Sequence, residues 1–86
     1  MKKEKLYTEF EELGQRLGVK IIKGRGNFAG GTCVVNEETV IVVNRQKPIE
    51  QRLKTLASSF LDYNLDDVFM VPALRAYIEE SRSLDL

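Results

Sequence analysis

Apolar residues in the first part of the chain recur at the spacing of an amphipathic helix. The spacing is four, three and four positions in the series Leu6, Phe10, Leu13 and Leu17. These residues share one face of a 3.6-residue helix, and charged residues occupy the other faces. Gly18 follows, and glycine readily takes the left-handed conformation that ends a helix. The pattern predicts a helix over residues 3–17.

Three short runs rich in β-branched residues follow this helix and predict strands. They cover residues 19–23, 32–35 and 39–43. Asn36 opens the connection between the last two runs, and asparagine tolerates the positive φ that tight hairpin turns need. We therefore expect a β-hairpin. The unbroken apolar run within the third strand is typical of a central strand or of one covered on both faces.

Helical spacing returns in the second half of the chain. Pro48 suits the first turn of a helix, where its missing N–H is not needed, and Asn64 suits the end of that helix. Asp66 or Asp67 is expected to cap a last helical segment by accepting backbone hydrogen bonds. Pro72 is expected to divide that segment.

The expected order of elements is α-β-β-β-α-α, which belongs to the α+β class. We expect a three-stranded, mostly antiparallel sheet with the helices packed on one face. The apolar faces of the helices need a surface, and only the sheet is large enough to provide one. Residues 1–86 are expected to form a single domain, with residues 81–86 as a frayed tail.

Composition removes several classes of chemistry. The chain contains no His and one cysteine, Cys33. It lacks the commonest general base and the commonest metal ligand, so catalysis that depends on histidine or on a thiolate-bound metal is excluded. Cys33 lies in a predicted strand, where we expect it to be a small buried residue. Composition leaves open an enzyme that uses only Asp, Glu, Lys, Ser or Thr.

Charge and hydropathy place the chain in an ordinary globular class. Its net charge is +0, and no apolar run is longer than that of residues 40–43, which is far shorter than the roughly 20 residues of a membrane helix. The acidic residues Asp62, Asp66 and Asp67 lack the spacing of a calcium-binding loop. We expect a cytoplasmic protein that has no cofactor, no metal and no association with a membrane.

A glycine-rich basic segment is the strongest local anomaly. Four glycines fall within residues 24–31, and a strand rather than a helix follows them, so the dinucleotide-binding pattern does not apply. Residues 1–35 carry seven basic and four acidic groups, whereas residues 36–86 carry six and nine. One interpretation is a loop that only turns the chain, with Phe28 packed on the core. The other is a contact site for an anion or for single-stranded nucleic acid.

The candidate contact residues of this second interpretation are Lys20, Lys23, Arg25, Gly26, Asn27 and Phe28. Backbone N–H groups would meet the phosphates, and the aromatic ring would stack on a base. Such binding would weaken steeply with salt.

A strand that ends in an asparagine precedes the helix that Pro48 begins. Asn44 ends the strand, and the helix carries Arg52 and Ala57. In these features residues 39–62 resemble the strand–helix core of zinc metallopeptidases of the ImmA/IrrE type, in which the helix continues as Ala-His-Glu-x-x-His. The resemblance implies a related fold for this part of the chain.

The residues that would hold the zinc in that family are absent. Ser58 stands at the position of the first histidine, Ser59 at that of the catalytic glutamate and Asp62 at that of the second histidine. The resemblance therefore implies at most a degenerate, non-catalytic relative. The chain as a whole also resembles small proteins found in bacterial genomes.

The leading hypothesis is a non-enzymatic protein-interaction domain. Its partner would be a second copy of the chain or another protein, bound through the helices or through an exposed edge of the sheet. The alternative is an anion-binding or nucleic-acid-binding module that uses residues 20–31.

Overall fold

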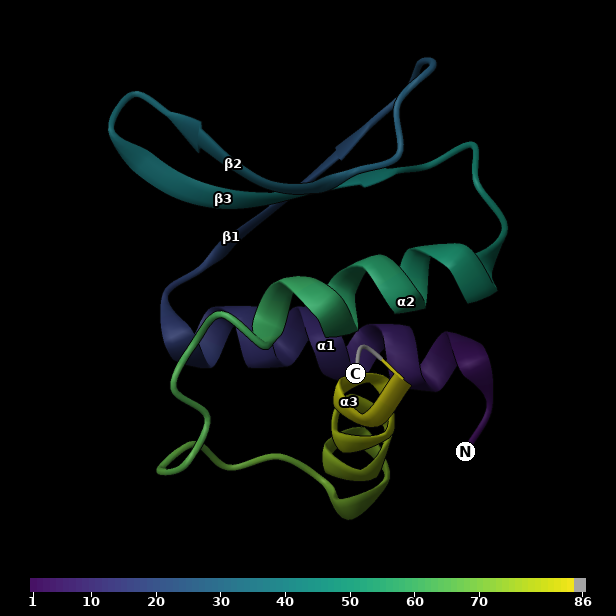
Figure 1. Ribbon diagram of the computed structural model, residues 1–86, viewed down its shortest axis with the longest axis vertical. Coiled ribbons are helices and arrows are strands. Elements are labelled where there is room, and N and C mark those ends of the chain that lie inside the picture. The colour runs from purple at the N-terminus through teal and green to yellow at the C-terminus, as the bar shows by residue number, and fades with distance from the viewer. Residues whose placement is uncertain (85–86) are drawn as a thin grey trace.

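Three helices and a three-stranded sheet make up residues 1–84, which the computed structural model describes (Figure 1). The elements are α1 (Lys3–Leu17), β1 (Lys20–Gly24), β2 (Gly31–Val35), β3 (Glu38–Asn44), α2 (Ile49–Phe60) and α3 (Pro72–Leu84). The predicted α+β class is confirmed. All three helices lie on one side of the sheet, and the opposite face is open (Figure 1).

The sheet is mixed, with the strand order β1-β3-β2. The first ladder is parallel, and it places Lys20 of β1 opposite Val40 of β3. The second ladder is antiparallel, and it places Gly31 of β2 opposite Val42. The expectation of a mostly antiparallel sheet is wrong for β1, because β3 inserts between β1 and β2. Both β1 and β2 are consequently edge strands.

A tight turn joins β2 to β3, as predicted. Asn36 has a φ of 51° and Glu37 a φ of 66°. Two central residues with positive φ give a turn whose twist matches the right-handed twist of the strands that it joins. The hairpin is confirmed, and Glu37 shares with Asn36 the conformation expected of Asn36 alone.

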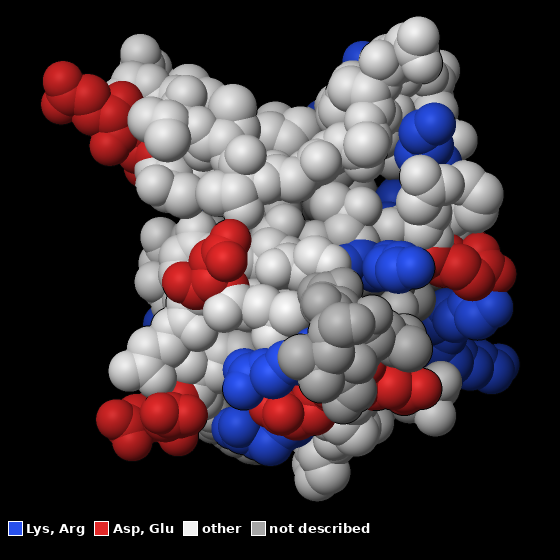
Figure 2. Space-filling view, viewed as in Figure 1, with Lys and Arg blue, Asp and Glu red and all other residues white. Residues whose placement is uncertain are grey.

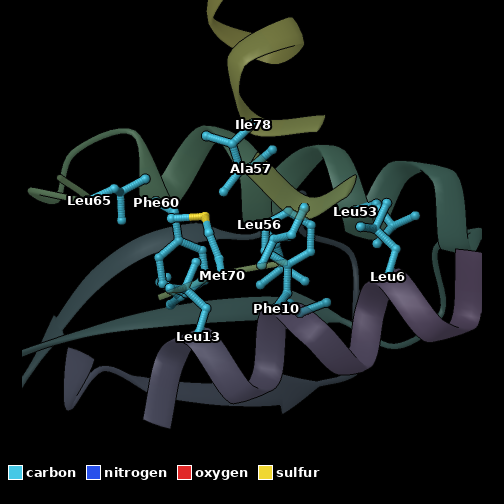
Figure 3. Close-up of a cluster of buried hydrophobic side chains, with 13 residues drawn as sticks. Leu6, Phe10, Leu13, Leu53, Leu56, Ala57, Phe60, Leu65, Met70 and Ile78 are labelled. Carbon is cyan, nitrogen blue, oxygen red and sulfur yellow. The ribbon is translucent and has the colours of Figure 1, made fainter. Parts of the chain in front are cut away.

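The core lies between the sheet and the helices α1 and α2, and continues between these two helices and α3. The expectation that all the helices pack on the sheet is wrong for α3, which contacts α1 and α2 instead. The rings of Phe10 (α1) and Phe60 (α2) stack with their centroids 5.9 Å apart, and Tyr77 (α3) meets Phe10 edge-on at 5.9 Å. Figure 3 shows the side chains of α1 and α2 pointing toward one another. The buried cluster contains Leu6, Phe10, Leu13, Ile41, Val43, Leu53, Leu56, Ala57, Phe60, Leu65, Met70, Leu74 and Ile78.

The alternation of side chains assigns each strand residue to one face of the sheet. Ile41 and Val43 of β3 belong to the core, so they face the helices. Because successive strand residues point to opposite faces, Val40 and Val42 face the open side. Ile22 lies opposite Val42 and is 36% exposed. The open face is therefore apolar along its centre.

The connection between α2 and α3 differs from the prediction. The helix α2 ends at Phe60, four residues before the expected stop at Asn64. The Asn64 side chain instead accepts a hydrogen bond from the Asp66 N–H at 3.0 Å within a turn. The chain leaves the helix there because Leu65 and Met70, which follow, are buried in the core.

The helix α3 begins at Pro72, so neither Asp66 nor Asp67 caps it. Proline suits this first position because its missing N–H has no partner there in any helix. Residues 81–84 continue α3, and the remainder of the expected frayed tail, residues 85–86, lies outside the described residues. Within residues 1–84 no helix has the length and hydropathy needed to span a bilayer.

Candidate interaction site

The glycine-rich loop between β1 and β2 is fixed by a buried asparagine at the end of β3. Asn44 is 1% exposed, and its Nδ2 donates to the carbonyl oxygens of Gly26 and Phe28 at 2.8 and 2.6 Å. Its Oδ1 accepts a hydrogen bond from the Gln46 N–H at 3.0 Å. The Gln46 side chain in turn accepts one from the Gly26 N–H at 3.3 Å. The loop is therefore tied to the sheet through its own backbone.

The ring of Phe28 packs on glycine backbone. It is half-buried, and a Cβ atom at Gly24 would lie 3.2 Å from its Cζ. A Cβ atom at Gly26 would lie 3.5 Å from its Cδ1. The absence of side chains at both glycines lets one edge of the ring lie close to the loop backbone, and this contact accounts for part of the glycine content.

One of the basic candidates, Lys23, is held on the helix side of the sheet. It lies opposite Val43, a core residue, so it points toward α1. Its Nζ lies 2.8 Å from Glu11 Oε2, and this hydrogen bond raises the pKa of Lys23. The Tyr7 ring lies beneath it, with 5.7 Å between Nζ and the ring centroid. Lys23 is therefore engaged within the domain.

The remaining contact candidates do not meet at one point. Lys20 begins β1 and Gly24 ends it, so the two ends are about 13 Å apart at 3.3 Å per residue. Arg25 and Asn27 are exposed in the loop. The described residues include no ion pair for Lys20 or Arg25. Binding of an anion or of nucleic acid stays a prediction. Such binding would depend mainly on the exposed side chain of Arg25, rather than on backbone N–H groups directed at one point.

The outer edge of β2 is the most distinctive feature of the surface. In residues 1–84, β2 pairs only with β3, and no strand covers its other side. The strand contains no charged residue. Val34 is 68% and Val35 42% exposed. Cys33 is exposed rather than buried because it lies on an edge strand, whereas Val40, its partner on the central strand, is 1% exposed.

The outer edge of β1 has a different character. Its sequence carries Lys20 and Lys23 among five residues. Natural proteins use lysines on edge strands to prevent pairing with foreign chains. The strand β2 has none of these charges, so the two edges of the sheet are unequal.

Two hollows flank the glycine pair at the start of β2. One, of about 340 Å³, lies between the pair and α2 and is lined by Gly30, Gly31, Gln51, Lys54, Thr55, Ser58 and Ser59. The other, also of about 340 Å³, is lined by Phe28, Ala29, Gly30, Gly31, Thr32, Cys33 and Val42. In Figure 2 the surface between the hairpin tip and the glycine-rich loop is hollowed and largely uncharged.

The residues at the expected zinc positions lie in the last turn of α2 and just beyond its end. Ser58 is exposed and Ser59 is buried, and both line the hollow beside α2. Asp62 lies beyond the end of α2 and outside the lining of that hollow. Two histidines of an H-E-x-x-H motif need a continuous helix to share one face. Among residues 1–84, no three His, Cys, Asp or Glu side chains gather as a metal site would require.

Sequence reasoning missed the residues that line the hollow beside α2, namely Gln51, Lys54 and Thr55. They occupy ordinary helix positions, exposed for Gln51 and Lys54 and half-buried for Thr55, and no motif marks them. The uncharged composition of β2 was visible in the sequence, but its position at an edge was not.

No family model, curated protein or solved structure matches the chain. The resemblance of residues 39–62 to ImmA/IrrE-type metallopeptidases therefore stays a prediction, and the functional argument rests on geometry.

Proposed function

We propose that this domain is a non-enzymatic protein-interaction module that binds an extended chain along the outer edge of β2. The observation that carries the proposal is the outer edge of β2, which pairs with no strand in residues 1–84, carries no charge and has two exposed valines, Val34 and Val35. An edge of this kind supplies backbone hydrogen bonds for a partner strand, and neighbouring pockets select its side chains. The two hollows beside Gly30 and Gly31 provide such pockets.

The character of the hollow beside α2 favours binding over catalysis. It contains the hydroxyl group of Ser58 and, one helical turn earlier, Lys54, which are the residue types of serine–lysine catalysis. A catalytic lysine is activated by burial or by a neighbouring cation, whereas Lys54 is exposed. The described residues include no hydrogen bond between Lys54 and either serine of the hollow. These groups suit the recognition of a peptide backbone.

The proposal predicts that the partner contacts position 34 and not the opposite edge. A photoreactive residue such as p-benzoylphenylalanine, placed at Val34, should cross-link to one defined chain in the cells that produce the protein. The same residue at Ile22, an exposed apolar residue on β1, is the matched control. Mass spectrometry then identifies the cross-linked chain, whether it is a second copy or another protein.

Blocking the edge tests whether this cross-link depends on strand addition. Thr32→Lys introduces an edge lysine at an exposed position of β2 and should abolish the cross-link from position 34. Circular dichroism should show an unchanged fold. The proposal is wrong if position 34 gives no defined product, if position 22 gives the same product, or if Thr32→Lys leaves the product unchanged.

A further inference from the structure

We infer that the chain that covers the edge is a second copy of the same chain, paired strand to strand as an antiparallel, two-fold symmetric β2–β2 ladder centred on Cys33. This inference rests on the proposed function and names the partner. In such a dimer both copies use the same surface patch. If one residue of the first copy faces a given residue of the second, the same contact occurs with the two copies exchanged. The five residues of β2 then pair completely, with Cys33 on the axis.

The register follows from the length of the strand. With Cys33 opposite Cys33 of the second copy, Gly31 faces Val35 and Thr32 faces Val34 across the interface. Directly opposed residues on an antiparallel ladder have side chains on the same face of the sheet. Val35 is therefore placed opposite a glycine, which has no side chain, and Val34 is placed opposite Thr32, a residue of similar size.

The two valines would fill the two hollows. Val35 lies on the open face, because its partner within the chain, Glu38, alternates with the core residues of β3. Opposite Gly31 of the second copy, it meets the hollow lined by Phe28 and Val42. Val34 lies on the helix face and would come beside Thr32 and the hollow that α2 borders. The domain thus offers both the protruding groups and the spaces that receive them.

Charge at the two ends of β2 favours the antiparallel arrangement. The hairpin tip after Val35 carries Glu37 and Glu38, which are exposed. Lys54 borders the hollow at the opposite end, beside Gly31. None of these three residues forms an ion pair among the described residues. Antiparallel pairing brings the acidic tip of each copy toward Lys54 of the other, whereas parallel pairing would bring like charges together.

This pairing would bring the two copies of α2 toward each other. A two-fold axis perpendicular to the sheet places both copies of α2 on the same side of the extended sheet. The flank of α2 beside the glycine pair carries Thr55, Ser58 and Ser59, which are short, and Gln51 and Lys54, which are longer. Helices can approach to about 8–10 Å where the contacting side chains are small.

Disulfide trapping at Cys33 tests the register. Directly opposed residues of an antiparallel ladder have Cα atoms about 4.5–5.5 Å apart, within the range that a disulfide spans. The purified chain treated with a mild oxidant should form a covalent dimer through Cys33, the only cysteine. The same treatment in denaturant, where the copies meet only by collision, is the control and should give little product.

Sedimentation analysis of variants tests the contacts without the disulfide. Thr32→Lys and Val34→Lys should each be monomeric at concentrations where the parent chain is dimeric. Ile22→Lys on β1 should remain dimeric. Lys54→Glu and Glu37→Lys should each weaken the dimer roughly 3- to 10-fold, as expected for two symmetric surface ion pairs. The double variant, Lys54→Glu with Glu37→Lys, should recover most of the lost dimer affinity. Structural damage caused by either substitution alone would not be reversed by the other.

The outcomes separate this inference from the proposed function. A parent chain that is monomeric at every concentration and forms no Cys33 disulfide overturns the self-pairing. A dimer that persists in both Thr32→Lys and Val34→Lys overturns it as well, because its interface then lies elsewhere. If position 34 nevertheless cross-links to a different protein, the proposed function stands with another partner. If position 34 cross-links to nothing, both fail.

Discussion

Replacing Asn44 by alanine should lower the free energy of unfolding by about 2–4 kcal/mol, although the residue carries no chemistry of its own. The substitution removes both hydrogen bonds to the Gly26 and Phe28 carbonyls and the one from the Gln46 N–H. Each bond contributes about 1 kcal/mol, and partly buried groups left without a partner add to the loss. A domain of this length has about 4–13 kcal/mol in total, so the effect is large.

Denaturant unfolding measures this loss, and two further variants identify its cause. Asn44→Asp retains an acceptor for the Gln46 N–H but sets a carboxylate against the two carbonyl oxygens, so it should lose at least as much as Asn44→Ala. Asn64→Ala removes one exposed hydrogen bond and should cost less than about 1 kcal/mol. If Asn44→Ala and Asn64→Ala lowered the free energy of unfolding by the same small amount, Asn44 would not fix the glycine-rich loop as described.

Replacing Gly30 by alanine should cost about 3 kcal/mol. Gly30 has a φ of 97°, a conformation that side chains disfavour by roughly 1–3 kcal/mol. A Cβ atom there would also lie 2.7 Å from the carbonyl oxygen of Val42 and 3.3 Å from Cγ2 of Thr55. The carbonyl belongs to the central strand and cannot move without disturbing the ladder. The close approach therefore adds to the conformational cost.

Gly31→Ala is the matched control for this substitution. Gly31 has a φ of 136°, but an added Cβ atom would meet nothing within 4 Å. Only the conformational cost applies, and the loss should be about 1–2 kcal/mol. Both variants are compared by denaturant unfolding in the Thr32→Lys background, so that association does not contribute to the measured stability. A loss at position 31 equal to or larger than that at position 30 would contradict the packing described for Gly30.

The helices and the hairpin could be predicted from the sequence because their signals are local. The spacing of Leu6, Phe10 and Leu13 defines the buried face of α1, and all three residues are in the core. Asn36 supplies a positive φ where the hairpin needs it. In both cases the residues that determine the structure lie within a few positions of one another.

The order of the strands could not be predicted because it depends on contacts between distant residues. The strand β3 lies between β1 and β2, which neighbour each other in sequence. The parallel pairing of Ile21 with Ile41 places both on the face toward the helices, but an antiparallel neighbour would satisfy the same alternation. The early end of α2 is also a tertiary effect, since it brings Leu65 and Met70 onto the core.

The interaction edge of β2 could be predicted only in part, because its place in the sheet also depends on contacts between distant residues. The absence of charge in residues 31–35 is evident, but whether these residues form a central or an edge strand depends on the strand order. The burial expected for Cys33 is wrong because β2 is an edge strand, and that again depends on the strand order. Conversely, the glycine-rich loop drew attention as a binding site, whereas much of its glycine content lets Phe28 and Val42 approach the backbone.

The central claim is that another strand covers the outer edge of β2, and amide hydrogen exchange resolved by residue tests it most directly. The measurement compares the assembly that cross-linking at position 34 identifies with the monomeric Thr32→Lys variant. The account predicts slower exchange in the assembly for the β2 amides that do not bond to β3, and equal exchange in both samples for the amides of β1. Equally fast exchange of the β2 amides in both samples, or protection that appears on β1 instead, would contradict it.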